Sequence, residues 1–215
     1  MNDTYTFEAG VLSASAGSAW GTDLQPGAAG VADGPNIETA PAGQKFLGRF
    51  ENTRTNAVLN LPNGYTNWLL TLDLYIIGSW DGKGKQAQHG IFLANVFSVS
   101  YRCGSADPVA ILRTTFSNQY TVQQDYPKEF GLGGYKAGTG SYGQDLLNYI
   151  SRPDLSNTPQ FRSFGDTEYT LTFGGTNPCG TNQPVQFIFS TSNPTQQSVW
   201  DESWGVDNVT IKAGT

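Results

Sequence analysis

The sequence of 215 residues has few charges and no long apolar run. No segment approaches the roughly 18 consecutive apolar residues of a membrane-spanning helix, so we expect no such span. Charged residues make up only 14% of the chain, which excludes a coiled coil, a charged helical bundle and an acidic disordered tail. With 12 basic against 18 acidic residues, the net charge is −6, and a nucleic-acid partner, which requires a basic face, is not expected.

Histidine occurs only once, as His89. A single imidazole excludes zinc and copper sites that are built from several histidines. It also excludes Ser-His-Asp and Cys-His catalysis, unless His89 itself serves as the base.

Cysteine occurs twice, as Cys103 and Cys179, and neither belongs to a CxxC motif or a Cys/His cluster. Two buried free thiols are one interpretation. The other is a disulfide bridge, because Gly104 and Gly180 follow the two cysteines and place both at turn-like sites. A bridge across so long a loop would stabilise the fold by about 4 kcal/mol if it acts on chain entropy.

The first residues carry no signal-peptide pattern. Met1–Tyr5 contains neither a basic segment nor an apolar one. Either the protein is not secreted, or the sequence is that of a mature domain preceded by an added methionine. The polar, lysine-poor composition favours the second interpretation, and with it an extracellular or cell-surface location.

What the chain has in abundance is glycine, at 26 positions, aromatic residues, at 13%, and alternation of apolar with polar side chains. In residues 67–77, for example, every second side chain from Trp68 to Ile76 is apolar, which is typical of a half-buried antiparallel strand. The same pattern predicts strands at 5–9, 44–50, 56–61, 95–102, 109–116, 168–174, 185–190 and 205–212, separated by glycine, proline and asparagine turns. The only helix-like stretch is 143–150.

Two segments stand apart from these strands. Residues 10–43 are rich in Ala, Gly, Ser and Pro, and residues 117–166 form a long connection studded with aromatic side chains. Structureless segments of this length are uncommon in compact domains and are often functional. No repeat or linker divides the chain, so we expect residues 1–215 to form one all-β domain, an antiparallel β-sandwich with jelly-roll-like connections and two long loops.

The last predicted strand carries a carboxylate in a core-facing position. Asp207 shares a face with Val209 and Ile211, and it therefore points to the core unless a bulge intervenes. A buried carboxylate is unfavourable unless it is paired, hydrogen-bonded or bound to a metal. The candidate cations are Lys45, Arg49 and Arg54.

Calcium is the alternative to a hydrogen-bonded structural Asp207, because Ca²⁺ takes six to eight oxygen ligands. Glu8 is the natural second carboxylate, since the terminal strands of such sandwiches often lie side by side. Backbone carbonyls of residues 44–52 would complete the shell. Such an ion would hold the chain ends together rather than take part in chemistry.

A second pattern joins the two ends of the chain, Tyr5-Thr6-Phe7-Glu8 with Trp20 downstream and the closing segment WGVDNV at 204–209. These ends resemble calcium-bearing jelly-roll carbohydrate-binding modules. Such domains commonly begin with an aromatic–Glu pair and end in an Asp-Asp/Asn-Val strand, and both carboxylates commonly bind a structural Ca²⁺. The resemblance implies the same roles for Glu8 and Asp207.

The middle of the chain, LDLYIIGSWDG at 72–82, is similar to the strand and SWDG turn of uncharacterised bacterial extracellular sandwich domains. Some of those belong to large surface or calcium-rich adhesin-like proteins, which implies a setting in cell adhesion but names no activity. TTFSN at 114–118 extends the similarity. Residues 83–94 look like an insertion, and Asn95 stands where an Asp is expected.

Several aromatic residues are candidates for binding a ligand. Trp80 either stacks on a sugar, with Asp81 as a hydrogen-bond partner or calcium ligand, or it caps the core. In Trp200-Asp201-Glu202-Ser203-Trp204, Trp200 is the ring expected to be exposed, beside either a binding site or a solvated acidic turn. The 117–166 segment adds Tyr135 and Tyr142 among amides and carboxylates, a composition that suits a glycan, a protein interface or a simply packed loop.

Catalysis is less well supported. Jelly-roll glycosidases need two carboxylates that face one cleft. Asp166 and Glu168 have a suitable spacing, but they precede a strand whose inward side chains are expected to be Tyr169, Leu171 and Phe173. We therefore expect both carboxylates to face solvent.

The sequence thus favours a non-catalytic extracellular binding domain, stabilised by calcium, for a polysaccharide or a glycoprotein glycan. The alternative is a structural subunit of a fibre, sheath or surface layer that self-assembles through its strand edges. A glycoside-active enzyme is the third hypothesis.

Overall fold

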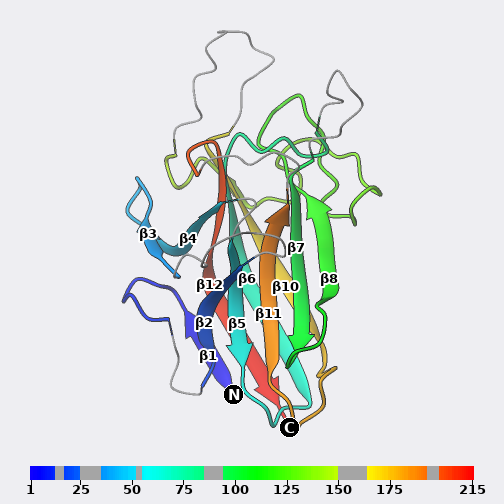
Figure 1. The fold of residues 1–215 in the computed structure, drawn as a ribbon. Helices are drawn as coiled ribbons and strands as arrows, with labels where there is room; N and C mark the ends of the chain where they lie inside the picture. Colours follow the sequence, from blue (N-terminus) through cyan, green and yellow to red (C-terminus); the bar gives the residue numbers. More distant parts are fainter. Residues whose placement is uncertain (13–16, 25–34, 52–54, 85–93, 150–163, 193–198) are drawn as a thin grey trace.

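The computed structural model describes seven segments of the chain, which form two antiparallel sheets packed face to face (Figure 1). The described residues are 1–12, 17–24, 35–51, 55–84, 94–149, 164–192 and 199–215. They contain strands and turns and no helix, so the predicted all-β sandwich is confirmed. None of them forms a helix long and apolar enough to cross a membrane.

The larger sheet has seven strands and the smaller one five. In the larger sheet the order is β3-β4-β12-β6-β10-β9, and β1 also pairs with β12. Its strands are β1 (Asn2–Tyr5), β3 (Ile37–Thr39), β4 (Lys45–Glu51), β6 (Asn67–Gly78), β9 (Gly143–Gln144), β10 (Asp166–Thr176) and β12 (Glu202–Gly214). The smaller sheet, ordered β2-β5-β11-β7-β8, contains β2 (Ala19–Leu24), β5 (Thr55–Leu61), β7 (Val96–Cys103), β8 (Val109–Thr115) and β11 (Val185–Ser192).

Alternating side chains from both sheets meet in one apolar core. Leu70, Leu72 and Leu74 of β6 have no exposed surface, as the alternation of this segment predicts. Phe97 and Phe187 reach the same core from the smaller sheet and are also fully buried. The strands predicted from alternation therefore exist because each has one face to bury.

The structure corrects three predictions about less regular segments. Residues 143–149 contain β9, bends and irregular chain rather than the start of a helix. The strand predicted over 5–9 is wrong, because β1 ends at Tyr5 and Phe7 has a φ of 55°. The segment 10–43 is not one long loop, since β2 pairs with β5 and β3 pairs with β4.

The second predicted loop, 117–166, is long and irregular where it is described. Residues 117–149 contain turns, bends, the short β9 and two isolated bridges. They lie at the end of the sandwich opposite the two chain termini, in green and yellow-green in Figure 1. Most of the connections that could form a site therefore gather at one end.

A β-bulge in β12 decides which way Asp207 points. The register between β12 and β6 shifts between Asp207 and Thr210, and Asn208 adopts a φ of 48°. Because of the extra residue, Val206 and Val209 both face the core between the sheets. Asp207 is only 5% exposed, but it lies on the outer face of the larger sheet, so the predicted core-facing orientation is wrong.

A second, smaller apolar cluster covers part of that outer face. We call it the outer cluster; it contains Ala40, Phe46, Tyr75, Ile77 and Leu147, with Tyr149 packed against it. Gly205 of the WGVDNV segment makes it possible, because a Cβ at that position would lie 2.4 Å from the Phe46 ring. The outer cluster is the structural base for the sites described next.

A disulfide joins Cys103, at the end of β7, to Cys179, 76 residues later. Of the two interpretations of the cysteines, the disulfide is thus confirmed. The bridge is consistent with an extracellular location, because disulfides persist in oxidising compartments.

Candidate functional site

An exposed tryptophan stands on a stacked base at the edge of the outer cluster. Trp200 is 72% exposed and lies in the turn that precedes β12. The guanidinium carbon of Arg49 lies 5.0 Å from the centroid of its ring and 4.9 Å from that of Tyr149. We call Arg49, Tyr149 and Trp200 the Trp200 platform. One face of the indole rests on Arg49, which leaves the other for a ligand.

The turn that carries Trp200 is fastened from two strands. Arg49 Nε donates to Ser203 Oγ at 3.0 Å, and its Nη2 donates to the carbonyl of Val199. Ser79 Oγ donates to Asp201 Oδ1 at 2.7 Å. Gly78 lets the turn come this close, since a Cβ there would lie 2.0 Å from the Asp201 carbonyl oxygen. The exposed ring is therefore held in one orientation.

The charge of Arg49 is compensated by Glu38, which lies beside the platform. Its Nη1 lies 3.9 Å from Glu38 Oε1, and the Tyr149 hydroxyl donates to the same oxygen at 3.3 Å. The Arg49 side chain is only 7% exposed, so burial makes this compensation necessary. The platform is thus electrically balanced and acts mainly through its rings.

Three carboxylates lie along the same outer face, further from Trp200. Asp73 of β6 pairs directly with Asp207 of β12, and Glu168 of β10 pairs with Tyr75. Asp73 Oδ1 accepts from Thr170 Oγ1 at 2.7 Å, and its Oδ2 accepts from the Asn208 side chain at 2.8 Å. Both donors are neutral, so they satisfy Asp73 without cancelling its charge.

Glu168 is buried in this row, and so is Asp166. Burial raises the pKa of Glu168 to about 7, with Asp166 and Asp73 adding repulsion and the Tyr142 hydroxyl opposing both. Burial likewise raises the pKa of Asp166, whose carboxylate accepts from the amides of Leu147 and Tyr149. The expectation that both face solvent is wrong, because they point outward as predicted but residues 142–149 pack against them.

Tyr142 covers this part of the outer face of the larger sheet. It is 53% exposed, and its backbone N–H donates to the Glu168 carbonyl at 2.9 Å. Burial of its hydroxyl and the charges of Glu168 and Asp73 raise the pKa of Tyr142, which therefore stays protonated. We call Asp73, Tyr142 and Glu168 the acidic subsite.

The residues predicted to hold calcium fit such an ion in part. Asp207 Oδ2 accepts from the Tyr75 hydroxyl at 3.1 Å, whereas its buried Oδ1 has no hydrogen-bond partner among the described residues. Burial, together with Asp73 and Glu8, raises the pKa of Asp207 to about 6. Glu8 is exposed, and its Oε1 accepts from the Lys45 amide at 3.0 Å.

A calcium ion at Asp207 would need further ligands. The described residues contain no group of three or more His, Cys, Asp or Glu side chains placed to hold a metal. The remaining ligands would thus be backbone oxygens, as expected from the sequence. The orphaned Asp207 oxygen is the observation that fits a cation there.

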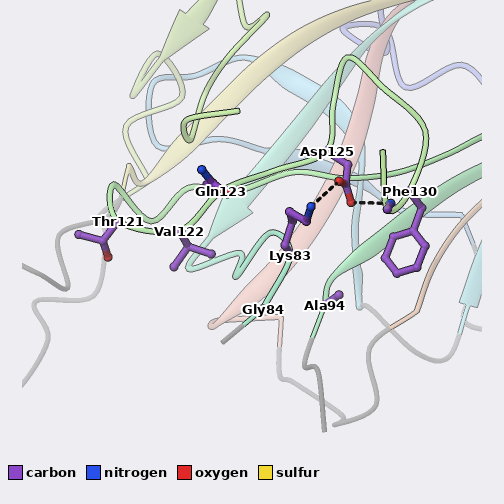
Figure 2. Close-up of a pocket in the computed structure, with 9 residues that line it drawn as sticks. Lys83, Gly84, Ala94, Thr121, Val122, Gln123, Asp125 and Phe130 are labelled. Atoms are coloured by element: carbon purple, nitrogen blue, oxygen red, sulfur yellow. Dashed lines mark hydrogen bonds and ion pairs between the residues drawn. The ribbon is translucent and has the colours of Figure 1, made fainter. Parts of the chain in front are cut away.

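A separate pocket of about 530 Å³ lies beside the 117–149 segment (Figure 2). Lys83 Nζ lies 3.2 Å from Asp125 Oδ1, and Figure 2 shows this pair at one side of the pocket, with the Phe130 ring nearby. Asp125 is fully buried and also accepts from the amides of Gly131 and Gly133. Gly84 and Ala94 line the pocket and flank residues 85–93 in the sequence; that segment includes His89 and lies outside the described residues, and we assign the pocket no ligand.

The predicted ligand-binding aromatics occupy four different settings. Trp200 is exposed on its platform and Tyr142 belongs to the acidic subsite. Tyr135 is partly buried and pairs with Gln124 in an isolated bridge. Trp80 has no exposed surface and donates its Nε1 hydrogen to the Ser203 carbonyl at 3.0 Å, so its proposed role as a stacking surface is not supported.

Sequence reasoning did not connect Arg49 or Asp73 with any of these residues in a ligand site. Arg49 was considered only as a partner for Asp207, and the structure pairs it with Glu38 instead. Asp73 carried a usable signal, because it is the only charged residue on the polar face of 67–77. Tyr149 carried none beyond its place in an aromatic-rich segment.

No protein-family model and no curated protein matches the sequence. Among solved structures, the xylan-binding module CBM15 is 9% identical, with a TM-score of 0.42 over 90% of each chain. The K3 adhesin domain of Lys-gingipain from Porphyromonas gingivalis is 16% identical, with a TM-score of 0.43 over 98% of each chain. An exo-β-1,3-galactanase from Phanerochaete chrysosporium is 8% identical, with a TM-score of 0.36 over 98% of this chain and 29% of the enzyme. Likenesses this distant say nothing about what this chain binds.

Proposed function

We propose that this chain is a non-catalytic extracellular binding domain that recognises carbohydrate through the Trp200 platform. The observation that carries the proposal is an indole ring, 72% exposed, whose back rests on a buried guanidinium. A ring this exposed leaves much apolar surface in water, and a ligand that covers it recovers that free energy. Because the turn is fastened, little ordering is needed on binding.

A sugar ring suits this platform better than a purely apolar ligand does. The C–H face of a pyranose stacks on an indole, while its hydroxyls need polar partners at the rim. The side chain of Glu38 is 31% exposed. It lies beside the stacked groups of the platform and offers carboxylate oxygens. The balanced charge of Arg49 and Glu38 favours no strongly charged ligand at this point.

Replacement of Trp200 by alanine tests the proposal. With the unmodified protein, we expect saturable binding to at least one plant, algal or bacterial polysaccharide in a pull-down or affinity electrophoresis panel. Trp200→Ala should weaken that binding by at least about tenfold, since buried aromatic anchors dominate such interfaces. Leu132→Ala is the matched control, because Leu132 is 74% exposed and belongs to neither the platform nor the acidic subsite.

Silence across the whole panel would overturn the proposal. So would binding that Trp200→Ala and Leu132→Ala leave equally unchanged. A self-assembling structural subunit, the alternative, would instead form oligomers or filaments in size-exclusion chromatography and electron microscopy.

We also propose that Asp207 and Glu8, with backbone oxygens, hold a structural Ca²⁺. The ion would supply the positive partner that Asp207 Oδ1 lacks among the described residues. We expect the melting temperature to fall in EDTA and to recover with Ca²⁺ but not with Na⁺ at equal ionic strength. Asp207→Asn should abolish the response to Ca²⁺. An identical melting temperature with and without EDTA would show that the assignment is wrong.

A further inference from the structure

The acidic subsite concentrates negative charge, and no described residue supplies a matching cation. Asp73 and Glu168 lie on neighbouring strands, and Asp166 is two residues from Glu168. The ion pairs found among the described residues, Arg49–Glu38, Lys83–Asp125 and Arg102–Asp23, all lie elsewhere. A positive group arriving at this surface would therefore find anions that no described basic side chain neutralises.

Glu168 supplies the second, independent observation. It is only 4% exposed, and its Oε1 has no hydrogen-bond partner among the described residues. Buried carboxylate oxygens are almost always partnered, because desolvation without a partner is costly. Its neighbours Tyr142, Asp166 and Asp73 include no cation. No described residue supplies the charge that would compensate Glu168, and a bound proton or a bound cation would supply it.

Tyr142 gives this charge an accessible surface. Its ring is half exposed, while its hydroxyl lies against Glu168 and Asp73. The face of an aromatic ring attracts a cation, and an ammonium group with three N–H donors can also bond the carboxylate of Asp73. Glu168 is buried beneath this surface and attracts such a group electrostatically.

The acidic subsite and the Trp200 platform are connected. Tyr149 stacks on Arg49 beneath Trp200, and its amide donates to Asp166 Oδ2 at 3.1 Å. Asp166 lies two residues before Glu168 in β10. Both sites therefore sit on the outer side of the larger sheet and are joined by the outer cluster.

We propose that the acidic subsite binds the ammonium group of an amino sugar, so that the glycan recognised by this domain carries free amines. This inference rests on the proposed carbohydrate-binding function and names the class of its ligand. It also predicts rejection of glycans that carry carboxylate or sulfate groups, because these meet uncompensated anions.

Two oligosaccharides of equal length separate charge from shape. Isothermal titration calorimetry at neutral pH compares a glucosamine hexamer with an N-acetylglucosamine hexamer, which lacks the ammonium groups. We expect the glucosamine hexamer to bind at least about tenfold more tightly. Glu168→Gln and Asp73→Asn should each reduce that preference, whereas Asp107→Asn, the same loss of charge on an exposed turn, should not.

The outcomes of these titrations distinguish failure of the amino-sugar inference from failure of the proposed function. Equal affinity for the two hexamers, with loss of both in Trp200→Ala, would overturn the amino-sugar inference and leave the proposed function standing. Failure of both hexamers and of the wider polysaccharide panel would overturn the proposed function. A preference for glucosamine that survives Glu168→Gln and Asp73→Asn but fades with salt would show unspecific attraction to an acidic protein, and would also overturn the inference. Melting curves of the variants confirm that each is folded.

Discussion

The Trp200 platform and the acidic subsite share one face of one sheet but treat charge in opposite ways. In the platform, the Arg49 guanidinium has a carboxylate, a hydroxyl and a carbonyl as partners. In the acidic subsite, Glu168 is as deeply buried as Arg49 but keeps an oxygen without a partner among the described residues. Burial alone thus does not determine how a charge behaves.

The difference teaches what each region is suited to do. A buried ion with all its partners in place holds a fixed geometry, and its role is to present Trp200 rigidly. A buried ion that lacks a partner is poised to respond, because a proton or a cation stabilises it. We therefore expect the platform to respond to substitution, and the acidic subsite to respond to pH and to cations.

Removal of Arg49 should have the largest effect. Arg49→Ala removes the cation beside Glu38, which keeps only the Tyr149 hydroxyl, and the donor to the Val199 carbonyl and Ser203. This loss should lower the free energy of unfolding by about 3 kcal/mol. It should also weaken glycan binding, because the turn that carries Trp200 loses its anchor. Urea denaturation and affinity electrophoresis measure the two effects.

Arg113 provides a matched control for this prediction. Its guanidinium lies 4.3 Å from the Phe130 ring centroid, but the residue is exposed. Arg113→Ala should change stability only slightly. Equal losses in both arginine variants would show that the partners around Arg49 contribute nothing special.

A change of pH should have a smaller effect, and it should act on the acidic subsite. The pKa of Glu168 is about 7 in the folded chain against an ordinary value of 4.5. A raised carboxyl pKa means that the folded state binds the proton more tightly, so this contribution is complete below about pH 4.5 and is lost as pH rises through about 7. We expect the protein to be more stable at pH 5 than at pH 8 by about 2 kcal/mol.

Glu168→Gln should remove the share of that pH dependence that Glu168 contributes, because an amide does not titrate, while the raised pKa values of Asp207 and Asp166 keep the rest. Arg113→Ala again serves as the control and should keep it. Stability that rises from pH 5 to pH 8 in the unmodified protein would contradict the prediction. Urea midpoints measured across this range make the comparison.

Much of the fold could be predicted from residues that alternate. The pattern around Leu70, Leu72 and Leu74 identified β6, and similar patterns identified the other long strands. β2 and β3 were missed because their sequences alternate weakly, and they are held mainly by pairing with β5 and β4. The predicted helix at 143–150 failed because a short apolar pair such as Leu146 and Leu147 does not decide between helix and turn.

The candidate sites, like the fold, could be predicted from the sequence only in part. Exposure of Trp200 and burial of Asp207 were both expected from local sequence. The support of Trp200 by Arg49 was not, because the two residues are 151 positions apart and meet only through the pairing of β4 with β12.

The sequence by itself determined an all-β sandwich with an unusual buried carboxylate and a tryptophan at its surface. Tertiary structure alone decided that Asp207 faces outward, since one extra residue in a strand reverses every side chain beyond it. It also decided that Glu168 is covered, because the covering residues belong to 142–149 rather than to the neighbouring part of its own strand. Alternation is a local property with a period of two, whereas burial on an outer face depends on distant chain that no local pattern contains.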